Sequence, residues 1–189
     1  MNRAGPSPEQ QTLSLQQALE LAVRHHSAGE LPKAEKICQQ ILQADPDQPV
    51  VLHLLGMISH QVGENDRAVH LITKALKIRP NYAEALANLG NVLRELGQPD
   101  DAVTNYYKAV AIEPDFVEVH SNLGVVLKEL ERPDEAVIHC QRALEIKPNM
   151  AEAHNNLGNA LQELGKLEEA LEHYQRALKI KPEYAKAHN

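Results

Sequence analysis

The chain has 189 residues and carries 19 lysines and arginines against 26 acidic residues, a formal net charge of −7 at pH 7. This acidic balance argues against nucleic acid or an anionic membrane surface as the main partner and favours a basic or neutral polypeptide segment. Hydrophobic residues make up 43% of the chain, enough for a packed core. No apolar stretch approaches the roughly 20 residues that span a bilayer, so we expect no membrane insertion and a cytoplasmic location.

Residues 1–14, MNRAGPSPEQQTLS, are rich in proline, serine and glutamine and lack the apolar core of a secretory signal. This composition predicts a disordered leader. Ser14 is expected to cap the first helix, with Gln17 reaching back as its capping-box partner.

From residue 15 onward one pattern recurs every 34 residues, in units 15–48, 49–82, 83–116, 117–150 and 151–184. Position within a unit is given below as a place from 1 to 34. Each unit has leucine at place 7, a small residue at place 8, alanine at place 20, alanine or isoleucine at place 27 and proline at place 32. The alanines of place 20 are Ala34, Ala68, Ala102, Ala136 and Ala170, and the prolines are Pro46, Pro80, Pro114, Pro148 and Pro182.

Within each unit the apolar residues recur at helical spacing in two bursts, which predicts two amphipathic helices. In the third unit these bursts cover residues 86–96 and 102–112. A glycine between the bursts can take the left-handed turn that closes the first helix, and a proline can begin the second. The turn glycines are Gly63, Gly97 and Gly165, and the prolines are Pro32, Pro99 and Pro133. Glu131 replaces the glycine in the fourth unit, so it either holds a left-handed conformation at some cost or changes the turn type.

Small residues at places 8, 20 and 27 allow two antiparallel helices to approach closely, and the proline at place 32 ends each unit. This pattern resembles the tetratricopeptide repeat family over about nine tenths of the chain. The resemblance implies an all-α fold, a right-handed α-solenoid of five helix-turn-helix repeats with a groove along its inner face. Residues 185–189 copy the opening of the fifth unit and predict the start of a truncated sixth repeat.

Asparagine accumulates on the predicted inner face of the first helices. It stands at place 6 in three successive units (Asn88, Asn122 and Asn156), at place 9 in two (Asn91 and Asn159) and once at place 5 (Asn155). A helix interior gains nothing from asparagine, but its amide matches the N–H and C=O groups of an extended peptide. We therefore predict that these six residues, with the inner cations Arg94 and Lys128, bind a polypeptide. The alternative is a packing feature copied by duplication.

The place-6 asparagines, called the asparagine ladder below, and the NLGN segments are similar to the repeat region of O-linked N-acetylglucosamine transferases. That resemblance implies that the ladder holds a polypeptide substrate. The preferred interpretation is a non-catalytic module that binds an extended polypeptide; one alternative is the recognition region of such a glycosyltransferase, with a catalytic domain downstream. A self-assembling scaffold is another, because the last helix is expected to expose Leu171, Tyr174 and Leu178 for end-to-end association through an uncapped C-terminal repeat.

Other reactive residues give no catalytic pattern. Cys38 and Cys140 both fall at place 24, three repeats apart, too far for a disulfide, and are interpreted as buried thiols. His120, His154 and His188 recur at place 4 and are interpreted as substitutes for an aromatic residue, because one metal ion needs its ligands within about 2 Å. His139 and His173 show no partner pattern in the sequence. We therefore expect no catalysis, no cofactor and no metal in this chain.

Overall fold

A computed structural model describes residues 14–182 and shows, within that range, ten α-helices and no strand. The predicted leader up to residue 13 and the predicted sixth repeat lie outside the described residues. The helices are α1 (Leu15–Ser27), α2 (Leu31–Ala44), α3 (Pro49–Gln61), α4 (Asn65–Ile78), α5 (Ala83–Glu95), α6 (Pro99–Ile112), α7 (Val117–Glu129), α8 (Pro133–Ile146), α9 (Ala151–Glu163) and α10 (Leu167–Ile180).

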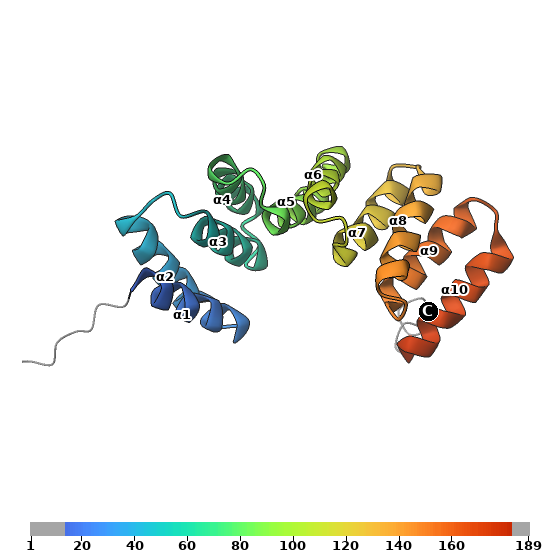
Figure 1. Ribbon diagram of the computed structural model, residues 1–189, viewed down its shortest axis with the longest axis horizontal. Helices are drawn as coiled ribbons and strands as arrows, with labels where there is room; N and C mark the ends of the chain where they lie inside the picture. The colour runs from blue at the N-terminus through green and yellow to red at the C-terminus, as the bar shows by residue number, and fades with distance from the viewer. Residues whose placement is uncertain (1–13, 183–189) are drawn as a thin grey trace, which may run out of the picture.

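The helices form five pairs that stack in chain order into an elongated array, with α1 near one end and α10 at the other (Figure 1). Within a pair each helix packs along its partner, and the second helix of a pair contacts the first helix of the next. The first helices of neighbouring pairs also touch, as α7 and α9 do. This arrangement confirms the predicted all-α solenoid, in which each pair is covered by its neighbours.

The helix ends follow the local chemistry of the sequence. The Ser14 hydroxyl accepts the Gln17 backbone N–H at 3.2 Å while the Gln17 side chain accepts the Ser14 N–H at 2.9 Å, so the predicted capping box forms. The turn glycines have positive φ, for example 72° at Gly97. Glu131 has φ 58°, so the fourth repeat keeps the same turn and holds a side chain in a left-handed conformation.

In the second to fifth repeats, the glycine at place 8 lies against the side chain at place 24 of the same repeat, on the second helix. A Cβ added to Gly90 would lie 2.5 Å from Cε1 of Tyr106, and one added to Gly124 would lie 2.2 Å from Sγ of Cys140. Both facing side chains are fully buried. The small residues of place 8 therefore allow the close packing expected of them.

Both cysteines are buried and free, as interpreted from the sequence. Burial raises the pKa of the Cys38 thiol to about 11 and that of the Cys140 thiol to about 12. Because the thiolate is the reactive form, neither residue is a nucleophile at neutral pH.

Candidate functional site

The asparagine ladder connects neighbouring repeats. Asn88 on α5 donates its amide N–H to Nε2 of His53 on α3 at 2.8 Å. Asn122 on α7 donates to Oδ1 of Asn91 on α5 at 2.9 Å. Asn156 on α9 likewise donates to the Ser121 hydroxyl on α7 at 3.1 Å. Each ladder residue thus reaches back to the first helix of the preceding repeat, a contact that the sequence pattern did not predict.

The sequence analysis did not identify His53 as part of this site, because its partners, Tyr82 and Asn88, lie 29 and 35 residues further along the chain. Its ring is buried, and Nδ1 lies 2.9 Å from the Tyr82 hydroxyl. Burial lowers the pKa of His53 to about 4, so the imidazole is neutral at pH 7. Since Nε2 accepts from Asn88, the single proton belongs on Nδ1, which donates to Tyr82. His53 therefore holds the side chain of Asn88, the first residue of the asparagine ladder.

The place-9 asparagines join the two helices of one repeat. Oδ1 of Asn91 accepts the Tyr106 hydroxyl at 2.7 Å. The single proton of the Tyr174 hydroxyl is shared between Oδ1 of Asn159 at 2.9 Å and Oε1 of Gln162 at 2.7 Å. Tyr174 is half-buried because its ring packs on Gly158 and the core of the fifth repeat, whereas the sequence predicted that it would be exposed. The expectation was wrong because the apolar pattern of α10 does not show that this ring faces the glycine at place 8 of α9.

Part of each ladder amide remains available. Asn88, Asn122 and Asn156 are half-buried, and within residues 14–182 no donor is bonded to the Oδ1 of any of them. Each amide also keeps a second N–H. Two other predicted residues, Asn155 and Arg94, are half-buried and make no side-chain hydrogen bond to a described residue. The predicted groove thus contains polar groups beyond those used in packing.

Lys128 and Asn159 are brought together at one cavity of about 480 Å³, which Gln162 and Glu163 complete. Lys128 Nζ lies 3.3 Å from Oε1 of Glu163. Both side chains are partly exposed, so the pair contributes little to stability, on the order of 0–1 kcal/mol. The cavity therefore offers a cation, a carboxylate and two amides.

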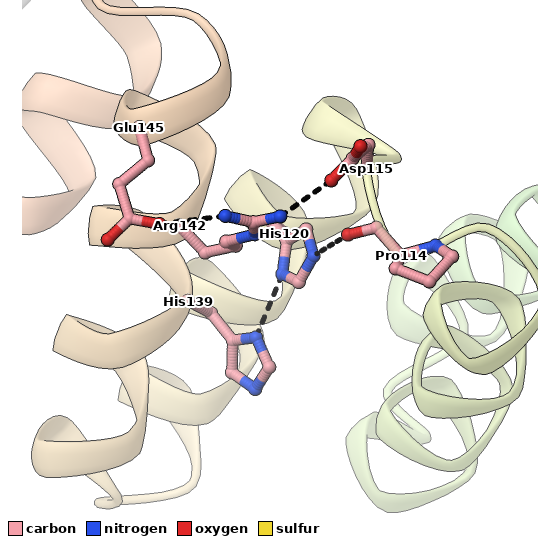
Figure 2. A network of polar contacts seen from close by, with 6 residues as sticks. All are labelled: Pro114, Asp115, His120, His139, Arg142 and Glu145. Carbon is pink, nitrogen blue, oxygen red and sulfur yellow. Dashed lines mark hydrogen bonds and ion pairs between the residues drawn. The ribbon is translucent and has the colours of Figure 1, made fainter.

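Two histidine pairs form a second polar cluster. His120 lies 3.0 Å through Nε2 from the Pro114 carbonyl oxygen and 3.0 Å through Nδ1 from Nδ1 of His139 (Figure 2). His154 repeats both distances with Pro148 and His173.

The second members of these pairs correct the sequence analysis, which gave His139 and His173 no partner. Each faces a place-4 histidine from the second helix of the same repeat, with ring centroids 5.2 and 5.3 Å apart. Since His120 Nε2 donates to a carbonyl, its Nδ1 accepts the Nδ1 proton of His139. Burial, and then the neighbouring His120, lower the pKa of His139 to about 4. His120 and His154 are buried like the aromatic residues they were expected to replace, whereas His188 lies outside the described residues.

Across residues 14–182, no group of three or more histidine, cysteine, aspartate or glutamate side chains is arranged to hold a metal ion. Nor does any helix in that range have the length and apolar character needed to cross a membrane.

The sequence matches family models over most of its length. Models described as tetratricopeptide repeat match residues 50–82, 71–104 and 115–183, and one described as TPR repeat matches residues 90–131. The chain belongs to the tetratricopeptide repeat family. No curated protein matches it.

Similar solved structures share this fold and are of comparable length. MamA from Desulfovibrio magneticus RS-1 is 22% identical with a TM-score of 0.78, covering 87% of this chain and 93% of its own. A MamA structure from AMB-1 is 28% identical with a TM-score of 0.73, covering 86% and 88%. YrrB, described as a TPR protein with an unusual peptide-binding site, is 24% identical with a TM-score of 0.75, covering 89% and 87%. The family and the fold support a protein–protein interaction scaffold.

Proposed function

We propose that the chain is a non-catalytic interaction module that binds an extended polypeptide along its first helices α5, α7 and α9. The observation that carries this proposal is the row of ladder carbonyl oxygens left without a donor on three successive repeats. An unpaired, half-buried acceptor loses part of its hydration without a replacement, so a ligand N–H placed there gains a hydrogen bond.

The spacing of the ladder suits an extended chain. Packed helices lie about 8–10 Å apart, and an extended chain rises about 3.3 Å per residue, so successive ladder amides meet backbone groups about three residues apart. Contacts of this kind bind the main chain of the ligand, so they select little for the identity of its side chains. The net charge of −7 favours a basic or neutral ligand. The cavity of Lys128 and Asn159 at the α7 and α9 end is suited to a polar ligand side chain.

Binding can be tested on an array of neutral and basic 12-residue peptides. The triple variant Asn88→Ala, Asn122→Ala, Asn156→Ala is expected to lose most captured peptides, because each substitution removes the free carbonyl. It also removes bonds between repeats, so its helix content and thermal midpoint are measured in parallel.

A second variant separates binding from folding. Arg94→Gln with Asn155→Ala breaks no side-chain hydrogen bond in residues 14–182 and is expected to weaken capture at unchanged stability. Asn105→Ala, on the second helix α6, is the control outside the predicted groove, and the one bond it breaks, to the Asp101 carbonyl oxygen at 2.8 Å, lies within its own helix. Equal capture of the same peptides by the wild type and the folded triple variant contradicts the proposal.

Self-association is a second candidate, favoured by the apolar surface of α10. Leu167, Leu171 and Leu178 are 64%, 56% and 38% exposed. Burying such side chains against another copy removes apolar surface from water at about 25 cal/mol per Å². Sedimentation velocity over a hundredfold range of concentration is expected to show growing species, which Leu171→Glu abolishes. A monomer at every concentration excludes this candidate.

The likeness of the ladder to the groove of O-linked N-acetylglucosamine transferases keeps substrate recognition for a glycosyltransferase as a further alternative. It requires a catalytic domain in the same polypeptide. Sequencing the intact gene tests it, since an open reading frame without a catalytic domain contradicts it.

A further inference from the structure

The histidine pair of the fourth repeat lies beside a closed ion-pair cluster (Figure 2). Arg142 on α8 lies 2.6 Å from Oδ1 of Asp115, in the loop before α7, and 2.9 Å from Oε2 of Glu145. The arginine therefore has two carboxylates from the protein itself.

The fifth repeat keeps the histidine pair and the arginine but has lost both carboxylates. Arg176 occupies the place of Arg142, Asn149 the place of Asp115, and Lys179 the place of Glu145. Arg176 is exposed and makes no hydrogen bond or ion pair within residues 14–182. The second copy of the cluster thus lacks the two carboxylates that hold Arg142 in the first, although it has Glu172 on α10 where the first has Ile138.

A cavity of about 500 Å³ opens beside Arg176, between α8 and α10 and over α9. Its polar wall includes His154, His173 and Arg176, and its apolar wall includes Leu144, Leu157 and Pro148. Glu145 also borders the cavity, but Arg142 holds its carboxylate at 2.9 Å. Glu169 and Glu172 on α10 act on His173 but do not line the cavity, so the charged lining group without an ion pair in residues 14–182 is the Arg176 guanidinium.

This cavity is separate from the groove of the asparagine ladder. The cavity takes two residues from α9, His154 and Leu157, at places 4 and 7. The asparagines of the groove on the same helix, Asn156 and Asn159, stand at places 6 and 9. At 3.6 residues per turn these two sets lie on opposite sides of the helix. A ligand in one site does not occupy the other.

We propose that the cavity beside Arg176 binds the carboxylate of an aspartate or glutamate, flanked by apolar residues, from a partner polypeptide. The carboxylate takes the position relative to Arg176 that Asp115 has relative to Arg142. A guanidinium suits this ligand because its planar fork can bind both carboxylate oxygens. The leucines of the cavity cover the flanking apolar side chains, which excludes water and strengthens the charged contact.

The probe is the peptide acetyl-Leu-Asp-Leu-amide, followed by NMR at the Arg176 Nε–H and the His173 ring. A saturable shift at both groups is expected with this peptide and not with its Asn analogue. Arg176→Gln is expected to weaken binding at least about threefold, the range for a partly exposed ion pair. Lys108→Gln removes an equal charge from the exposed surface of α6 and is expected to change nothing.

The most selective variant is Asn149→Asp, which gives Arg176 the aspartate that Arg142 has in Asp115. It is expected to fold normally, to engage Arg176 internally and to compete with the peptide. Equal binding of the Asp and Asn peptides, or unchanged binding in folded Arg176→Gln, overturns the proposal. So does tighter binding of inorganic phosphate than of the Asp peptide, because the site is then a general anion site. Loss of groove binding in the ladder variant leaves this site intact, so the two proposals fail separately.

Discussion

The contact between Gly90 and Tyr106 gives the sharpest stability prediction. Gly90→Ala places a Cβ 2.5 Å from Cε1 and 2.8 Å from Cδ1 of Tyr106. The ring is fully buried, and its hydroxyl is bonded to Asn91 at 2.7 Å. The ring therefore has no free space into which it can move, and the two helices must separate.

The expected loss is the difference between two effects. Overpacking of a buried contact costs about 1–3 kcal/mol. Alanine in place of glycine inside a helix returns about 1 kcal/mol. The net destabilisation is about 1 kcal/mol, which lowers the thermal midpoint by about 2–4 °C in a domain of this size.

A double-mutant cycle with Tyr106→Cys identifies the cause. The first repeat already combines Ala22 with Cys38, both fully buried, so alanine can face a cysteine whose sulfur does not take the position that Cys140 has opposite Gly124. In the Tyr106→Cys background, Gly90→Ala is expected to be neutral or stabilising, with a coupling of about 1 kcal/mol or more. Urea unfolding measures the cycle, and amide exchange in α5 and α6 locates the effect, since repeat arrays can unfold in parts. An additive cycle, or Gly90→Ala at least as stable as the wild type, refutes the reasoning.

Three further predictions concern Glu131, His53 and the two cysteines. Glu131→Gly is expected to stabilise the array by about 1 kcal/mol in urea unfolding, because φ of 58° is strained for a residue with a Cβ; an unchanged midpoint contradicts this. His53 has its pKa lowered from 6.5 to about 4 in the folded chain, so between these values only the unfolded state binds its proton, and stability falls as pH falls through that window, by up to about 3 kcal/mol. His53→Gln does not titrate and is expected to show a smaller loss between pH 7 and pH 4, whereas an identical pH profile counts against the assignment. Cys38 and Cys140 are expected to react with a thiol reagent only as fast as the chain opens, and rapid labelling of the native protein contradicts their burial.

The fold was predictable because its signals are local and repeated. Gly97 and Pro99 mark a turn within three residues, and the identity of each is enough to explain its conformation. Ser14 and Gln17 likewise form a capping box whose partners are three residues apart. Such features need no knowledge of how the repeats stack.

The polar contacts were not predictable in the same way. His53 and Asn88 are 35 residues apart, and their bond depends on the offset between successive helix pairs. His120 and His139 belong to different helices of one repeat, and their places suggest no pairing unless the helix rotation is known. The sequence located the asparagines, whereas their bonding required the structure.

One oxygen, Oδ1 of Asn91, accepts both the Tyr106 hydroxyl of its own repeat and the amide of Asn122 in the next. In a one-dimensional array, coupling between neighbours decides how far a local opening spreads. Unfolding that begins at α1 or α10 must break the hydrogen bond between Asn122 and Asn91 before it passes from α5 to α7 or from α7 to α5. The third and fourth repeats are therefore expected to stay packed together when the helix pair at either end of the array unfolds.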